Sequence, residues 1–99
     1  MTDKTLKAMT DVFAIEAECI REMADDFDEK AFLKAVELLK NAPRIGASGC
    51  GHSGIMCRHF AHLMCCIERH ARFISPAEAV HGATGFLHNG DAMHFPSHS

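Results

Sequence analysis

The first two dozen residues repeat their apolar positions with the period of an α-helix. One stripe advances by three or four residues at a time and consists of Leu6, Met9, Phe13, Ala17 and Ile20. This spacing predicts a helix over Thr2 to Ala24. A second stripe beside it consists of Val12, Ile15, Cys19 and Met23. Two interpretations stay open: two apolar faces, one packed against another subunit, or one wide stripe on a single core.

Acidic residues interrupt this pattern and are suited to begin a second helix. Asp26 followed by Glu29 fits a variant of the capping box, and Asp28 is an equally good cap. The apolar spacing continues to about Asn41, and Pro43 ends the helix. The positions predicted to be buried are Phe32, Leu33, Val36 and Leu39.

After Pro43 the pattern changes to short apolar runs alternating with helical segments. Strands are predicted at Ile45 to Ser48, Ala71 to Ser75 and Asp91 to Phe95, with a helix from about Ser53 and a helical turn at Pro76. This succession is typical of a parallel sheet with crossover helices. We therefore predict an α/β protein: a truncated flavodoxin-like, three-stranded parallel sheet of order 2-1-3, preceded by an N-terminal helical pair.

The same pattern suggests two domains and an association between chains. We expect an N-terminal helical arm over residues 1–43 and a partial α/β domain over residues 44–99. The third strand of such a sheet would be an unpaired edge, and unpaired edges recruit other chains. We predict a homo-oligomer, held by the N-terminal helices, by the edge at Asp91 to Phe95, or by both.

Composition excludes several classes of protein. The chain has 99 residues, a net charge of −3 and five cysteines without a C-x-x-C pair. It shows no basic cluster for nucleic acid, no apolar run long enough for a bilayer, and no signal peptide at Met1 to Thr5. We expect a cytoplasmic protein with reduced thiols that binds neither nucleic acid nor membranes.

A glycine-rich turn, Gly49-Cys-Gly-His-Ser-Gly54, joins the first predicted strand to the helix that follows. The unpaired amides and the dipole of a helix N-terminus favour anions, most often phosphate. In open parallel sheets, ligands bind beyond the carboxyl ends of the strands. The first and third of these ends, Ser48 to Ser53 and Ser97 to Ser99, carry hydroxyls but no lysine or arginine. We therefore predict an anion site built from dipoles.

Two cofactor classes can be weighed against this interpretation. The turn matches the G-x-G-x-x-G fingerprint of dinucleotide sites, but no acidic residue ends the second strand, so no cofactor is predicted. His59, His62 and Cys66 share one flank of the central helix and could hold zinc with a water. Packing or surface roles are favoured for these three residues, so no metal is predicted. The expected core stripe beside them is Met56, Phe60, Leu63 and Ile67.

From Arg44 to Ser99 the chain resembles the first half of a sugar isomerase (SIS) domain, the phosphosugar-binding fold. The resemblance is carried by Gly49 to Gly54, by Ser75-Pro-Ala-Glu-Ala-Val-His-Gly82 and by Gly90-Asp-Ala-Met-His-Phe-Pro-Ser-His-Ser99. The middle segment, P-A-E-A-x-H-G, is typical of the branch that is similar to arabinose 5-phosphate isomerases. The resemblance implies a sugar phosphate bound by hydroxyls and amides of two loops.

The resemblance also implies particular residues. Ser53, with Gly51 and His52, matches the first phosphate loop; Ser97 and Ser99 match the start of the second; Glu78 and His81 match P-A-E-A-x-H-G. With Ser48 at the end of the first strand, these eight are the predicted phosphate- and substrate-binding residues. The isomerase branch has a lysine in place of His52 and a histidine in place of Ser75. His52 is the candidate base, and a polar loop residue is the favoured alternative.

The sequence therefore predicts a phosphosugar-binding protein related to aldose–ketose isomerases and catalytically incomplete as this chain. Isomerisation moves a proton between adjacent carbons, and loss of its base largely abolishes turnover. An active isomerase completed by a partner chain or by a longer natural protein is the alternative. A metal-binding regulator is a more distant one. Enzymatic activity stays open at this stage.

Overall fold

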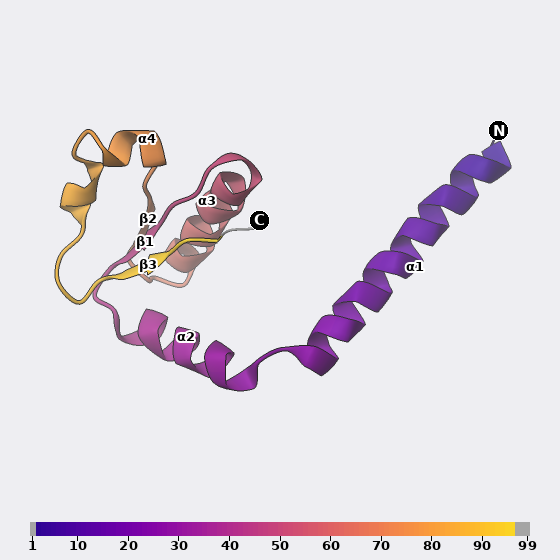
Figure 1. The fold of residues 1–99 in the computed structure, drawn as a ribbon, viewed down its shortest axis with the longest axis horizontal. Helices are drawn as coiled ribbons and strands as arrows, with labels where there is room; N and C mark the ends of the chain where they lie inside the picture. The colour runs from indigo at the N-terminus through magenta and orange to yellow at the C-terminus, as the bar shows by residue number, and fades with distance from the viewer. Residues whose placement is uncertain (1, 97–99) are drawn as a thin grey trace. The chain divides into compact units, whose positions relative to one another are not determined.

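A computed structural model describes residues 2–96 of the chain (Figure 1). The elements are α1 (Thr2–Asp26), α2 (Glu29–Asn41), β1 (Ile45–Ala47), α3 (Gly51–Cys66), β2 (Ala71–Phe73), α4 (Pro76–Ala79), the 3-10 helix η1 (Ala83–Phe86) and β3 (Ala92–His94). They form two compact units that divide after Lys34, within α2. The domain boundary expected after residue 43 stays a prediction.

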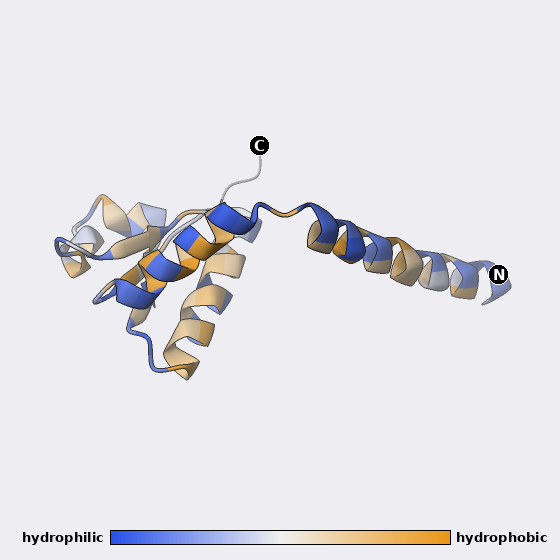
Figure 2. Cartoon of the chain, turned by 90° about the horizontal axis from the view of Figure 1, so that it is seen from below, coloured by the Kyte–Doolittle hydropathy of each residue, from blue (hydrophilic) through white to orange (hydrophobic). Residues whose placement is uncertain are grey.

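In the first unit, α1 is a 25-residue helix without a buried residue. Figure 2 shows hydrophobic and hydrophilic residues recurring along its whole length. Its polar surface carries two ion pairs at helical spacing: Lys7 with Asp11 at 2.8 Å and Arg21 with Glu18 at 3.2 Å. Such exposed pairs each contribute only a few tenths of a kcal/mol, roughly 0.3–0.5. Within the first unit, no apolar residue of α1 is buried.

The start of α2 shows which acid caps it. The Ala31 N–H donates to Asp28 Oδ1 at 3.0 Å, so Asp28 is the cap rather than Asp26. Phe27, just before the cap, meets Phe32 edge to face with ring centroids 5.9 Å apart. This contact between the residue preceding the cap and the fourth helical residue is a hydrophobic staple, which fixes how the chain enters the helix.

The burial predicted along α2 is wrong. Phe32, Leu33 and Val36 are exposed, and no residue of the helix is buried. Periodicity identifies the apolar face of a helix but does not supply the surface that covers it. Only Leu39, near the C-terminal end, is half-buried.

In the second unit, the three strands form a parallel sheet of order β2-β1-β3, which confirms the predicted topology. Ile45 in β1 lies opposite Ala71 in β2 and Ala92 in β3. All three residues of β1 are buried, whereas those of β3 are half-buried. A central strand covered on both sides is typical of parallel sheets.

Helix α3 packs along the sheet through its small residues (Figure 1). Gly54, Cys57 and Ala61 are its buried positions, and the Cys57 thiol donates to the Ser48 carbonyl at 3.3 Å. The core stripe predicted for this helix is therefore wrong in three positions: Met56, Leu63 and Ile67 are exposed. Small side chains let the helix approach the sheet closely, so the larger ones lie on other faces of the helix.

At the amino edge of the sheet, charged groups pair with one another. Asp91 is only 2% exposed; its Oδ2 lies 3.2 Å from the Arg44 guanidinium and accepts the His88 N–H at 2.7 Å. Burial by itself raises the pKa of Asp91. The His88 N–H and the Arg44 charge outweigh this effect, so the pKa of the carboxyl lies below its usual value.

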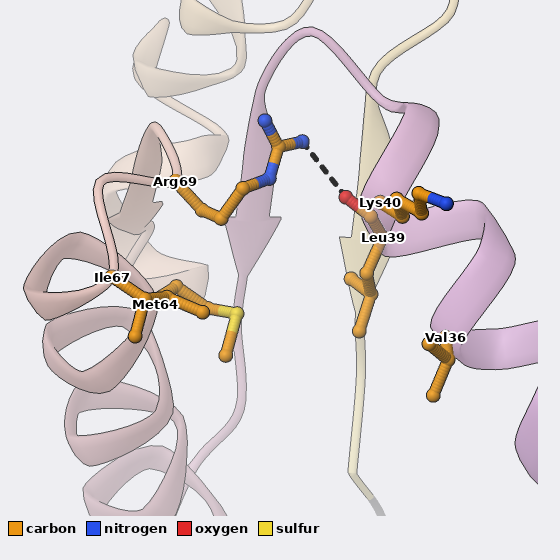
Figure 3. Close-up of a pocket in the computed structure, with 6 residues that line it drawn as sticks. All are labelled: Val36, Leu39, Lys40, Met64, Ile67 and Arg69. Carbon is orange, nitrogen blue, oxygen red and sulfur yellow. Dashed lines mark hydrogen bonds between the residues drawn. The ribbon is translucent and has the colours of Figure 1, made fainter.

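Arg69 ties the end of α2 to the segment before β2. Its guanidinium donates to the Leu39 carbonyl at 2.8 Å and also to the Ala42 carbonyl. Figure 3 shows the bond to Leu39 above an apolar hollow between α2 and α3. Val36 and Leu39 line the hollow on one side, and Met64 and Ile67 on the other. The two bonds satisfy carbonyls at a helix C-terminus that otherwise have no partner.

No helix among residues 2–96 is both long and apolar enough to cross a membrane.

Candidate functional site

The turn between β1 and α3 leaves the start of the helix open. The first intrahelical bond runs from the Gly54 N–H to the Cys50 carbonyl, at 3.2 Å. The amides of Gly51, His52 and Ser53 therefore precede the helical hydrogen-bond ladder. Cys50 is the N-cap residue in an extended conformation, and its side chain makes no capping bond. The positive end of the α3 dipole is thus uncapped at the carboxyl edge of the sheet.

Glycine is required at both ends of this turn because the chain folds closely onto the helix. A Cβ placed on Gly54 would lie 2.6 Å from the Gly49 carbonyl oxygen, a distance that real side chains do not reach. A Cβ on Gly49 would lie 3.1 Å from the Ser53 carbonyl carbon. The close approach holds the turn directly against the first turn of α3. The glycine pattern seen in the sequence therefore has a steric cause.

A hollow of about 420 Å³ lies between this turn and the segment that follows β2. From the first side it is lined by Gly49, Cys50, Gly51, Gly54, Ile55 and Arg58, and from the second by Phe73, Ser75, Pro76 and Ala77. Ser75 precedes α4 and makes no side-chain capping bond. Its hydroxyl is therefore not used in closing the helix. The hollow has the position at which ligands bind in open parallel sheets.

Arg58 is the functional candidate that the sequence did not reveal. Its guanidinium carbon lies 4.2 Å from the centroid of the Phe73 ring, which holds the charge beside the hollow. Among the described residues Arg58 forms no ion pair. The prediction of a site built from dipoles alone is therefore incomplete. The sequence held one indication of this role, which is helical spacing. Arg58 follows Gly51, Gly54 and Ile55 at steps of three or four residues and therefore shares their face of α3.

The structure distributes the predicted site residues unevenly around this hollow. Gly51 lines it, and His52 and Ser53 follow in the same helical turn, His52 exposed and Ser53 half-buried. Ser48 is buried at the end of β1, and its amide bonds to the His94 carbonyl at 3.0 Å. These four residues surround one strand end, and their binding roles stay predictions.

The remaining predicted residues lie elsewhere. Glu78 and His81 are exposed and are not among the residues that line the hollow. The His81 amide donates to the Glu78 carbonyl at 2.9 Å, a turn at the end of α4. Ser97 and Ser99 fall outside the described residues. Between residues 2 and 96, no three His, Cys, Asp or Glu side chains gather as a metal site, so His59, His62 and Cys66 form none.

The arrangement suits anion binding better than proton transfer. Three amides, a helix dipole and one guanidinium converge from α3, and each favours negative charge. The side chains that line the hollow include no carboxylate and no imidazole. Acid–base chemistry would need groups from outside this lining, because a general base must lie within hydrogen-bond reach of its proton.

One solved structure is similar to this chain over almost its whole length. It is the crystal structure of a proposed sugar-phosphate isomerase from Listeria monocytogenes, with a TM-score of 0.84 and 33% sequence identity. The match covers 93% of this chain and 49% of that protein, so this chain spans about half its length. No protein-family model and no curated protein matches the chain. The structural match supports the resemblance to sugar isomerase domains.

Proposed function

We propose that this chain is a phosphosugar-binding member of the sugar isomerase domain family. The observation that carries the proposal is the uncapped N-terminus of α3 at the carboxyl edge of β1, with Arg58 beside it. A phosphoryl group presents several oxygens and a charge near −2, which such an end accommodates. The similarity to the Listeria protein, a proposed sugar-phosphate isomerase, supports a sugar phosphate as the ligand of this site.

The phosphate is expected to lie on the amides of Gly51, His52 and Ser53. Arg58 then contributes a full positive charge from the neighbouring turn of the same helix. The sugar extends across the hollow toward Ser75, whose hydroxyl is available to a sugar hydroxyl. Small-molecule pockets usually measure about 300–1,000 Å³, so the space of about 420 Å³ fits a pentose phosphate.

We further propose the arabinose 5-phosphate branch as the source of the ligand, on the strength of the P-A-E-A-x-H-G segment that begins at Pro76. Binding without turnover is the proposed activity of the described residues, because the lining of the hollow holds no carboxylate and no imidazole. The alternative is an active isomerase in which a partner chain or further residues of a longer protein supply those groups.

The test is a titration of the ¹⁵N-labelled chain with arabinose 5-phosphate, followed by amide chemical shifts. The amides of Gly51, His52 and Ser53 should move first and saturate together. Arabinose without phosphate is the matched control and should move them little, because it lacks the charged group. Inorganic phosphate should move the same amides at higher concentration.

Shifts confined to other segments, or none at millimolar ligand, would contradict the proposed site. A coupled assay for conversion of arabinose 5-phosphate to ribulose 5-phosphate separates the two activities. Binding without product formation fits the proposal, and turnover at a rate above that of buffer fits the alternative. Equal shifts with arabinose and its phosphate would show that the phosphate group does not contribute to binding at this turn.

A further inference from the structure

Three basic side chains of the second unit gather around one aromatic ring. The ring belongs to Phe86, which ends η1 and is half-buried. The guanidinium carbon of Arg44 lies 5.3 Å from the centroid of this ring, and that of Arg72 lies 5.6 Å from it. The ring of His70 lies 5.8 Å away, measured between centroids. We call these four residues the Phe86 cluster.

The register of the strands explains why these cations share one face of the sheet. Arg72 in β2 and Met93 in β3 both pair with Gly46 in β1, so the three positions lie on the same face. Side chains alternate along a strand, so Arg44 and His70, each two residues earlier, also belong to this face. Figure 1 shows α3 on one side of the strands and the segment from α4 to η1 on the other. The Phe86 cluster therefore lies on the face opposite α3.

The Phe86 cluster holds more positive than negative charge. Arg44 is paired with the buried carboxylate of Asp91 at 3.2 Å. Arg72 is exposed and forms no ion pair with any residue between 2 and 96. His70 is exposed as well and adds a charge when it is protonated. Like charges around one ring repel one another, so a negatively charged ligand would stabilise this arrangement.

We propose that the Phe86 cluster binds a small dicarboxylate, at a site separate from the glycine-rich turn. A guanidinium that lies over a ring keeps its N–H donors at its edge, and their planar fork matches a carboxylate through two parallel bonds. Arg72 takes the first carboxylate in this way. The second carboxylate meets His70 and the donors of Arg44 that Asp91 does not use. This proposal does not depend on phosphosugar binding.

The positions of the cations favour two separated negative charges over one concentrated charge. Arg44 precedes β1 and Arg72 lies within β2, so the two guanidinium groups approach the ring from different strands. A phosphate group concentrates its charge on the oxygens of one atom, and near Arg44 the Asp91 carboxylate repels it. A dicarboxylate divides its charge between two ends, so each end can meet a cation of its own.

Strand β2 carries two contacts between an arginine and a phenylalanine, and they lie on opposite faces. Phe73 follows Arg72 in the chain and points to the other side, where the Arg58 guanidinium lies 4.2 Å from its ring centroid. None of the four residues of the Phe86 cluster lines the hollow beside the glycine-rich turn. A substitution on one face should therefore leave ligand binding on the other face unchanged.

The experiment is a titration of the ¹⁵N-labelled full chain with succinate at constant ionic strength, followed by chemical shifts. The amides of His70, Arg72 and Phe86 and the Nε–H of Arg72 should move and saturate together. Arg72→Gln should weaken succinate binding about 10-fold, because it removes a charged fork from an exposed site. Arg72→Lys should recover only part of the affinity, since an ammonium group lacks the planar fork.

Arg58→Gln is the matched control for these variants. It removes the same charge from the opposite face of β2 and should leave succinate affinity unchanged. Acetate is the control ligand and should bind more weakly at equal carboxylate concentration, because it has a single charged end. His70→Gln should weaken succinate binding by a smaller factor than Arg72→Gln does. Circular dichroism checks that each variant is folded, and His70→Gln decides the test if Arg72→Gln is not.

Several outcomes would overturn the proposal. Shifts that grow linearly without saturation would show only a general effect of ions. Equal affinity of the wild type and Arg72→Gln, or tighter binding of inorganic phosphate than of succinate, would contradict the assigned ligand class. Shifts at the Gly51 and Ser53 amides instead would place the acid on the glycine-rich turn. Binding of a glutamate-rich peptide without binding of succinate would point to a protein partner in place of a small molecule.

Discussion

The two ends of the central sheet use charge in opposite ways. At the amino edge, Arg44 and Asp91 pair at 3.2 Å, and the second acceptor interaction of Asp91 comes from the His88 amide. At the carboxyl edge, Arg58 has an aromatic ring beside it but no carboxylate, and the amides that open α3 precede the hydrogen-bond ladder. Arg44 lies 5.3 Å from the Phe86 ring, as Arg58 lies beside Phe73, yet among the described residues only Arg44 is paired with a carboxylate.

This difference distinguishes a charged pair that is part of the fold, at Arg44 and Asp91, from an arginine without a carboxylate partner, Arg58. At the amino edge, Asp91 Oδ2 meets an arginine and an amide, whereas its buried Oδ1 accepts no hydrogen bond, so this charge is neutralised within the fold. An arginine stacked on a ring keeps its donors free for an anion, and a ring contact contributes about 0.5–1 kcal/mol at exposed sites. The carboxyl edge is thus the end of the sheet at which we propose that phosphate binds. Three substitutions test this contrast.

The largest effect is expected from Gly54→Ala at the carboxyl edge. The new Cβ would lie 2.6 Å from the Gly49 oxygen, so the turn must move away from α3. Overpacking of this kind costs about 1–3 kcal/mol, measured as the free energy of unfolding in urea. Phosphate binding should fall with it. Gly85→Ala is the control: nothing lies within 4 Å of its Cβ, so stability should stay within about 0.5 kcal/mol. Equal effects of the two variants would contradict the close-packed turn.

The next effect is expected from Arg58→Gln, which removes the charge beside the hollow. Affinity for arabinose 5-phosphate should fall about 10-fold by calorimetry, because a charge-assisted bond is lost at a partly screened site. Arg72→Gln is the matched control, since its guanidinium lies 5.6 Å from the Phe86 ring, away from the hollow. Arg58→Lys should retain part of the affinity. If Arg58→Gln binds as the wild type does, the phosphate lies elsewhere.

The smallest effect is expected at the amino edge and depends on pH. The pKa of Asp91 in the folded chain lies below its unfolded value of about 3.9. Its contribution to stability is therefore present above about pH 4 and is lost as the pH falls through the folded pKa. Asp91→Asn should be less stable than the wild type at neutral pH, and the difference should shrink as the pH falls below about 4. Thermal unfolding across that range measures it. A difference that stays constant with pH would contradict the ionised pair.

Much of the fold was predictable because its pattern is local. The parallel strands around Ile45, Ala71 and Ala92 appear as short apolar runs, and their order 2-1-3 was the one expected of a flavodoxin-like sheet. The glycine turn was found for the same reason. The choice between Asp26 and Asp28 as the cap could not be made from sequence, since both acids fit and only the geometry shows the bond to Ala31.

What the sequence missed depends on tertiary contact. The buried face of α3 consists of Gly54, Cys57 and Ala61, which hydropathy ranks below the larger residues on its other faces. Arg58 lies far enough from the glycine turn in sequence that only the helical repeat brings it to the hollow. Stacking on Phe73 requires β2 beside α3, and no pattern within one segment encodes that contact.

The register of the sheet also orders the events of folding. Ile45 lies 26 residues from its partner in β2 and 47 residues from its partner in β3. Loop closure becomes slowly less favourable with length, at about 0.6 kcal/mol per doubling, so β2 should join β1 before β3 does. The β1–α3–β2 crossover would then form the nucleus, and the glycine-rich turn proposed to bind phosphate lies within it. The third strand would then add to a template in which the glycine-rich turn is already formed.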